Sequence, residues 1–166
     1  MPLFPPISVR QPRPFDIVDD PVHVCGVGTG FEGQFSALVR DANGTELALV
    51  GVRAGGSGTL GNFDVAIPLV CPPATTRGTL EVFEFSQRGD GSELHKVTVP
   101  VSFGPALIGE YHGFEQYTVE PGDTLSRIAQ QLYGEGSLST RLFDANRDEI
   151  SDPNLIFPGQ VLRIPR

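Results

Sequence analysis

The residues that most resemble a chemical motif lie at positions 25–33, which read CGVGTGFEG. Their last six residues fit the G-x-G-x-x-G spacing of a dinucleotide-binding turn. That turn binds a pyrophosphate only when a helix follows it, because the helix N-terminus supplies free backbone N–H groups. Residues 34–41 (QFSALVRD) alternate with the period of a strand instead. We therefore predict no nucleotide site, and we expect these glycines to let the backbone turn between two strands.

The other reactive side chains form no recognisable constellation. His23, His95 and His112 lack the spacing of metal ligands, which predicts no metal site. No Ser or Cys has a His and an orienting acid nearby in the sequence, so we assign no catalytic residue and expect neither an enzyme nor a cofactor. Cys25 and Cys71 could form a disulfide if the protein is exported; the alternative is two small buried side chains in a reducing compartment.

Composition and charge exclude several classes of partner. The formal net charge of −8 disfavours general nucleic-acid binding, which needs a Lys/Arg surface. No apolar run is long enough for insertion into a membrane. The N-terminal stretch MPLFPPISVRQPRPF does not have the pattern of a signal peptide. Localisation therefore stays open between the cell envelope, if the chain is exported, and the cytoplasm.

Residues 1–103 have the pattern of an all-β domain. Asn43-Gly44 separates two alternating runs, which is a strong signal for a β-hairpin. Further strand-like runs are VHVCGVG, NFDVAIPL, GTLEVFEFS and LHKVTVPVSF, and the RGDG segment at 88–91 is typical of a turn between two of them. About seven short strands at close spacing predict an immunoglobulin-like β-sandwich.

This region resembles a known bacterial family. The stretches VHVCGVGTGFEGQFSALVRDANG, GNFDVAIPL and GTLEVFEFSQRGDGSELHKVTVPVSF are similar to the Gmad2 immunoglobulin-like domain of spore-germination and envelope proteins. The resemblance covers residues 7–103 and implies a fold and a bacterial origin. The family has no well-defined activity, so a protein partner of the sandwich stays an open possibility.

Residues 104–116 mix Gly, Pro and isolated apolar positions, which is typical of a linker, and residues 117–166 have a different pattern. Leu125, Ile128, Ala129 and Leu132 form one helical stripe that Gly134 should end. A second helix is expected from Arg141 to Arg147, with Leu142 and Phe143 facing inward. The flanking runs Tyr117–Val119 and Val161–Ile164 should pair as two strands. The sequence therefore predicts a small α+β module of βααβ order, whose core is modest.

The pieces YTVEPGDTLSRIA, LYG, LFDAN and NLIFPGQVLRIP resemble the LysM domain over residues 116–165. That resemblance implies binding of N-acetylglucosamine-containing glycans, chiefly peptidoglycan or chitin, in a shallow groove between two loops. Carried onto this sequence, the implied glycan-binding residues are Gly122, Asp123, Thr124, Leu125, Pro153, Asn154, Leu155, Ile156 and Phe157.

The residue types suit an N-acetyl group, which offers an N–H, a C=O and a methyl. Asp123 or Thr124 could equally serve as a helix cap, and Leu125 and Phe143 could belong to the core. We expect non-catalytic binding of peptidoglycan that attaches the sandwich, or its partner, to the cell wall. The alternative is a cytoplasmic structural or adaptor protein, such as a component of a phage-tail-like or injection-system assembly, or an ion-sensing protein.

Overall fold

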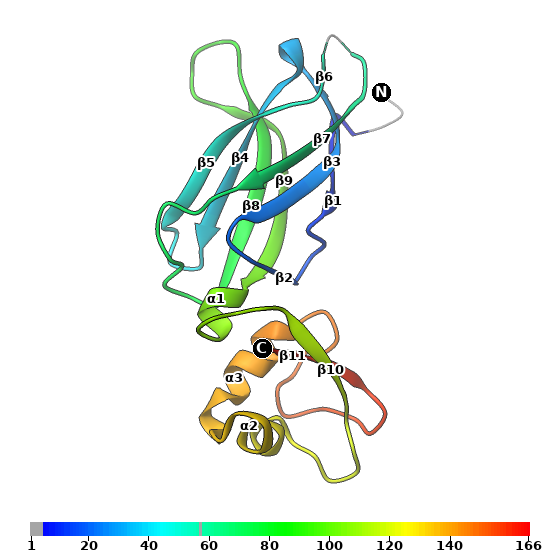
Figure 1. The fold of residues 1–166 in the computed structure, drawn as a ribbon. Helices are drawn as coiled ribbons and strands as arrows, with labels where there is room; N and C mark the ends of the chain where they lie inside the picture. Colours follow the sequence, from blue (N-terminus) through cyan, green and yellow to red (C-terminus); the bar gives the residue numbers. More distant parts are fainter. Residues whose placement is uncertain (1–4, 57) are drawn as a thin grey trace.

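The computed structural model describes residues 5–56 and 58–166. A β-sandwich is followed by a smaller α+β module, and the short helix α1 (Gly104–Leu107) lies where the two meet (Figure 1). Both parts of the predicted fold class are confirmed. The strands of the sandwich are β1 (Ile7–Gln11), β2 (Asp16–Val18), β3 (Val22–Gly30), β4 (Gln34–Asp41), β5 (Glu46–Arg53), β6 (Gly55–Gly56), β7 (Gly61–Ile67), β8 (Arg77–Phe85) and β9 (Glu93–Phe103).

The sandwich consists of a four-stranded and a five-stranded sheet. In the first sheet β3 pairs with β1 and β7 on either side and with the short β6 near its end; in the second the order is β2-β9-β8-β4-β5. Alternate residues of each strand point between the sheets, so the strand period produces one continuous apolar core. The fully buried side chains of this core include Val22, Val24, Ala37, Val39, Leu47, Ile67, Leu80, Val82 and Phe103.

The N-terminal segment contributes two strands that the sequence pattern did not predict. β1 pairs antiparallel with β3, and β2 pairs parallel with β9 in the other sheet. The prolines at positions 12 and 14 separate them, since proline cannot donate to a ladder, and the chain crosses from one sheet to the other there. The described residues of the sandwich thus form nine strands rather than about seven.

The glycine-rich motif is part of a strand and not a nucleotide turn. β3 continues through it to Gly30, and only the 3₁₀ turn η1 (Phe31–Gly33) separates β3 from β4. Gly33, with φ 69°, is at the turn. Gly26 serves a different purpose, because a Cβ there would lie 2.2 Å from the backbone oxygen of Ser8 and 2.5 Å from Cζ of Phe63. Our expectation that the glycines allow turning is therefore correct for Gly33 and wrong for Gly26, which permits close packing.

The predicted hairpin at Asn43-Gly44 is confirmed. β4 and β5 pair antiparallel on either side of it, and Gly44 has φ 84°. Oδ1 of Asp41 accepts hydrogen bonds of 2.9 Å from the backbone N–H groups of both Asn43 and Thr45. The RGDG segment is likewise a turn, with the glycines at 89 and 91 at positive φ.

The two thiols are free in the structure. Cys25 is half-buried on β3, whereas Cys71 is exposed. The alternative of two buried side chains is therefore wrong for Cys71, which lies in the proline-containing segment between β7 and β8. Among the helices of the described residues, none is long and apolar enough to cross a membrane.

The C-terminal module has the predicted βααβ order. Its two strands pair antiparallel, with Tyr117 opposite Leu162. Residues 104–116, predicted as a linker, contain α1 and the first three residues of the module's first strand. The elements of the module are β10 (Phe114–Thr118), α2 (Leu125–Tyr133), the 3₁₀ turn η2 (Gly136–Leu138), α3 (Ser139–Ala145) and β11 (Val161–Pro165).

Both helices of the module end for identifiable reasons. Gly134, with φ 76°, terminates α2 as predicted. The second helix occupies Ser139–Ala145, two residues earlier than the predicted Arg141–Arg147. It ends early because Asn146 leaves the helical region, and the side-chain amide of this residue donates 2.8 Å hydrogen bonds to the carbonyls of Leu142 and Arg163.

The core of the module is much smaller than that of the sandwich. Leu125, Ile128 and Ala129 of the predicted stripe are buried, and Leu132 packs against them half-buried. The other buried members are Val119, Leu142, Ile150, Leu162 and Ile164. A core of this size leaves little margin, so the loops depend on local hydrogen bonds for their shape.

The sandwich and the module meet through polar contacts around one buried carboxylate. Asp144 of α3 is only 2% exposed. Its Oδ2 accepts a 2.5 Å hydrogen bond from Oγ1 of Thr76, and its Oδ1 lies 2.9 Å from Nε of Arg77. The hydroxyl of Ser102, on β9, donates to the backbone carbonyl of Asp144 at 2.5 Å. The side chain of Arg163 lies nearby between Asp16 and Asp148. We call Thr76, Arg77, Ser102 and Asp144 the boundary cluster.

Candidate functional site

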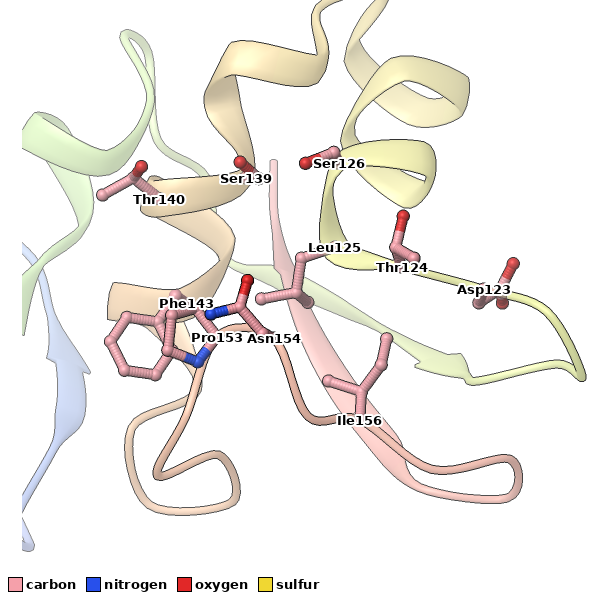
Figure 2. Close-up of a pocket in the computed structure, with 10 residues that line it drawn as sticks. All are labelled: Asp123, Thr124, Leu125, Ser126, Ser139, Thr140, Phe143, Pro153, Asn154 and Ile156. Carbon is pink, nitrogen blue, oxygen red and sulfur yellow. The ribbon is translucent and has the colours of Figure 1, made fainter.

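A groove of about 260 Å³ lies on the C-terminal module, between the start of α2, the start of α3 and the loop that precedes β11. Figure 2 shows Asp123 at one end of this groove and Thr140 at the other. Its walls combine hydroxyl, amide and apolar side chains. The residues that line it are Asp123, Thr124, Leu125, Ser126, Ser139, Thr140, Phe143, Pro153, Asn154 and Ile156.

Hydrogen bonds hold the loop before α2 in one shape. Gly122 adopts φ 90°, which favours glycine at this turn. Oδ2 of Asp123 accepts from the backbone N–H of Glu120 at 2.8 Å and from the hydroxyl of Tyr117 at 2.9 Å. The hydrogen bond to Asp123 raises the pKa of Tyr117 above its usual value. Asp123 therefore braces the turn.

Thr124, rather than Asp123, is the cap of α2. Its Oγ1 accepts from the backbone N–H of Arg127 at 3.2 Å, and its φ and ψ are extended. Of the two candidate residues, Thr124 is the cap because it directly precedes the first helical turn, and only a side chain at that position can reach the N–H of Arg127. The Thr124 side chain also lines the groove.

The facing loop is fixed from both sides. Oδ1 of Asp152 accepts from the backbone N–H of Asn154 at 2.9 Å, and Oε1 of Gln160 accepts from that of Phe157 at 3.2 Å. The backbone of Val119 bonds to that of Gln160 and Gly159, 2.8 Å each, which ties this loop to the strand leading into the first one. The two loops are thus parts of one connected frame.

The floor of the groove is apolar, and its rim is polar. Leu125 is buried in the module's core and lines the groove as well, while Ile156 and Phe143 are half-buried. Thr124 and Asn154 are exposed at the rim. Such an arrangement can take a methyl group against the floor and hydrogen-bond the polar groups beside it.

The structure brings together six of the nine predicted site residues. Gly122, Leu155 and Phe157 do not line the groove. The second loop begins with a turn at Pro153 and Asn154, and its later side chains differ in which way they face. Asn154 and Ile156 face the groove, and Leu155 and Phe157 are more than half exposed outside it. The groove-lining residues from the prediction are Asp123, Thr124, Leu125, Pro153, Asn154 and Ile156.

Four lining residues were not predicted: Ser126, Ser139, Thr140 and Phe143. Three of them come from α3, where positions three and four apart share one face. The spacing of Ser139, Thr140 and Phe143 would have placed them on one helical face. It could be used only if the helix was known to begin at residue 139. Phe143, which was expected in the core, both packs against the core and lines the groove.

Comparison with protein families identifies both parts of the chain. The model described as the immunoglobulin-like domain of bacterial spore germination, Gmad2, matches residues 6–92, just over half of the 166-residue chain. The chain belongs to the Gmad2 family. A LysM domain model matches residues 117–165. The Gmad2 domain is thus the sandwich, and the LysM domain is the module that carries the groove.

The similarity to curated proteins is confined to about fifty residues of each. The potassium binding protein Kbp of Escherichia coli O6:H1 is 53% identical over 49 residues, 30% of this chain and 33% of that protein. An uncharacterized protein of Deinococcus radiodurans is 51% identical over 49 residues, 30% of this chain and 19% of that protein. An esterase of Mycobacterium tuberculosis is 47% identical over 51 residues, 31% of this chain and 11% of that protein.

This chain therefore spans a third or less of the length of the relatives that it matches. Both matched families are domains of the binding type and not catalytic ones. In general terms, a LysM domain indicates binding of glycans that contain N-acetylglucosamine, such as peptidoglycan.

Proposed function

We propose that the LysM domain of this chain binds peptidoglycan through the groove described above, and that it attaches the Gmad2 domain, or a partner of that domain, to the cell wall. The proposal rests on one observation: the groove combines an apolar floor with polar groups at its rim, and hydrogen bonds fix the two loops that form it. An N-acetyl group needs that pairing, because its methyl is apolar while its N–H and C=O require partners.

The side chains can be assigned to these tasks. Leu125 and Ile156 supply the surface for the acetyl methyl. The Asn154 amide, at the rim, can donate and accept, and the hydroxyls of Thr124 and Ser126 can pair with sugar hydroxyls. Since hydrogen bonds already brace both loops, little ordering is required when a glycan binds, which favours affinity.

The size of the groove limits that affinity. Sites for small ligands typically enclose about 300–1,000 Å³, and this groove offers about 260 Å³. We therefore expect weak binding by one domain. Several copies on one particle or one wall fragment would raise the effective affinity, because the second contact is then intramolecular.

The groove is suited to binding and not to cleavage. Hydrolysis of a glycosidic bond ordinarily uses two carboxyl groups about 5–10 Å apart, one on each side of the bond. Among the groove-lining residues within the described chain, Asp123 is the single carboxylate, and it is occupied by Tyr117 and the N–H of Glu120. The proposal is therefore one of non-catalytic binding.

The test is retention of the full chain on purified peptidoglycan, with soluble N-acetylglucosamine oligomers as competitors. An Asn154→Ala, Ile156→Ala variant should lose most of the retention, since it removes a rim amide and part of the floor. Its matched control is Gln116→Ala, Val161→Ala, which removes one amide and one branched side chain from exposed positions on β10 and β11.

The control variant should be retained like the wild type, and the oligomers should release both. Thermal unfolding must accompany the assay, because Ile156 packs partly against the core and its truncation costs about 1–2 kcal/mol of stability. Equal retention of the two variants, or retention that the oligomers do not compete, contradicts the proposal.

A second candidate is a structural role, in which the LysM domain is a protein-contact module. The observation that favours it is the boundary cluster, where a LysM residue, Asp144, is buried against the Gmad2 domain. Failure of the wild type to bind peptidoglycan at high concentration, together with its recovery in a larger assembly of fixed stoichiometry, would support this candidate.

A further inference from the structure

A second hollow adjoins the groove at the boundary between the LysM and Gmad2 domains. Thr140, at one end of the groove, also lines this hollow, which has a volume of about 580 Å³ and is open to solvent. The other walls of this hollow are Asp144 of α3 and residues of the Gmad2 domain, namely Ala42 and the segment Ala74–Arg77. A linear ligand that leaves the groove past Thr140 therefore meets the surface of the other domain.

The second hollow contains an anchored cation. Nε of Arg77 lies 2.9 Å from Oδ1 of Asp144, whose other oxygen accepts the hydroxyl of Thr76. The Arg77 side chain is nevertheless 46% exposed. Within the described residues, the two terminal nitrogens of Arg77 make no hydrogen bond or ion pair with the protein. The ion pair holds the guanidinium beside the buried carboxylate, although Oδ1 of Asp144 accepts no hydrogen bond within the described residues, and the terminal nitrogens remain free for a ligand.

The charges along this path favour one orientation of a substituted glycan. Asp123 lies at the end of the groove away from Thr140 (Figure 2). A carboxylate on the ligand would be repelled at the Asp123 end. At the other end the charge of Arg77 is paired with Asp144, but its free terminal nitrogens can still form two parallel hydrogen bonds with a carboxylate. A neutral sugar gains nothing from this difference.

We propose that the hollow lined by Thr140 and Arg77 is a second subsite, which binds a carboxylate carried by the substituent of the sugar next to the one in the groove. In peptidoglycan every second sugar bears a lactyl ether, which is either free or linked to a peptide. Both sources present carboxylates, whereas chitin has none. This inference rests on the proposed function and makes peptidoglycan, rather than chitin, the preferred ligand class.

The test is calorimetric titration of the full chain with three glycan oligomers of equal length. One contains only N-acetylglucosamine, one alternates with sugars that bear the free lactyl carboxylate, and one bears the lactyl-linked peptide. The wild type should bind one or both acidic oligomers about tenfold more tightly than the neutral one, which corresponds to about 1.4 kcal/mol. Which acidic oligomer shows the gain identifies the source of the carboxylate.

The variant Arg77→Gln, Asp144→Asn removes the cation without leaving a lone buried charge. It should lose the preference for acidic oligomers and keep the wild-type affinity for the neutral one within about twofold. Arg88→Gln is the control for the arginine substitution, because it removes one guanidinium from the β8–β9 turn, at the opposite end of β8 from Arg77. Arg88→Gln should retain the full preference.

Three results overturn the inference. The first is equal binding of all three oligomers by the wild type. The second is a double variant that keeps the preference. The third is a double variant that loses neutral and acidic oligomers alike, so that Arg77 and Asp144 support the groove and not a separate subsite. If the wild type binds none of the oligomers, the proposed function itself fails, and that outcome differs from the first three because the neutral oligomer is also unbound.

Discussion

The two domains use their sequence in different ways. In the Gmad2 domain, two sheets enclose a large apolar core, and glycines such as Gly26 and Gly78 sit where a Cβ would touch backbone or a Phe ring. In the LysM domain the core is small, and the side chains of Asp123, Asp152 and Asn146 accept hydrogen bonds from backbone N–H groups and so hold the loops in place. Side-chain packing therefore determines the structure of the Gmad2 domain, whereas hydrogen-bonded loops determine the shape of the LysM surface.

The chain offers a natural probe of this difference. It has three tyrosines and no tryptophan, and Tyr111, Tyr117 and Tyr133 all lie beyond the sandwich. Tyr117 and Tyr133 therefore report on the LysM domain, whereas Tyr111, whose ring lies against Gly104 directly after β9, reports on the boundary between the domains. The strand component of far-UV circular dichroism comes mainly from the Gmad2 domain, and its helix component comes mainly from α2 and α3 of the LysM domain. The two signals together separate the unfolding of one domain from that of the other.

The largest effect is expected for Gly26→Ala in the Gmad2 domain. The new Cβ would lie 2.2 Å from a backbone oxygen, which the strand pair β1–β3 cannot relieve without moving. We expect a loss of about 3 kcal/mol in the free energy of unfolding of the sandwich, measured by urea denaturation with circular dichroism.

The matched control is Gly51→Ala on β5, where an added Cβ meets nothing within 4 Å. It should change the free energy of unfolding by at most about 0.5 kcal/mol, and in the stabilising direction. If the two substitutions destabilise equally, close packing is not the reason for Gly26, and the contrast between the domains weakens.

A smaller effect is expected at the boundary cluster. Asp144→Ala removes the partner of Arg77 and the acceptor of the Thr76 hydroxyl. We expect a loss of about 2 kcal/mol, because both contacts involve a charged group. The loss should appear in the tyrosine signal before the circular dichroism signal, since the LysM domain has the smaller core.

Its control is Glu115→Ala, which breaks the exposed ion pair with Arg166. Exposed pairs contribute little, so this change should stay within about 0.5 kcal/mol. An Asp144→Ala variant that unfolds like Glu115→Ala would mean that the boundary cluster does not couple the domains.

The smallest effect is expected at alkaline pH, where the stability of the LysM domain should fall as Tyr133 ionises. Burial raises the pKa of Tyr133 to about 12, and its hydroxyl donates to the carbonyl of Pro165 at 2.9 Å. Because the folded pKa lies above the usual value of about 10, the stabilisation is complete below pH 10 and disappears as the pH rises through 12.

Tyr133→Phe should cost about 1 kcal/mol at pH 8, where the hydrogen bond is lost. Its stability should then fall less steeply than that of the wild type between pH 10 and 12. The measurement is the urea midpoint from the helix component of circular dichroism across that range, because ionisation would quench the fluorescence of the remaining tyrosines. Parallel falls in both proteins would show that Tyr133 does not cause the alkaline loss.

Local patterns predicted the regular elements of both domains. Asn43-Gly44 indicates a hairpin, and in the structure it is Gly44 that takes the positive φ of the turn; Gly134 ends α2 through the same freedom of glycine. The stripe of Leu125, Ile128 and Ala129 indicated both the helix and its buried face. These features depend on neighbours within a few residues, so one sequence is sufficient to predict them.

Features that depend on distant partners were not predicted. β1 and β2 form only because β3 and β9 are available to pair with them, and the proline-rich sequence conceals them. Asp144 looks like an ordinary helical acid until Thr76 and Arg77 are brought beside it by the fold. Leu155 lies outside the groove, and this could not be predicted because it depends on the backbone conformation of the whole loop.

The most direct test of the central claim is a nuclear magnetic resonance titration of the isotopically labelled full chain with N-acetylglucosamine oligomers. If the groove binds the glycan, amide signals should shift in residues 123–126, 139–143 and 153–156, the three segments that enclose the groove. Signals from the Gmad2 strands β3 and β7 should not move. Absence of shifts at saturating oligomer, or shifts confined to the Gmad2 domain, would contradict glycan binding by this groove.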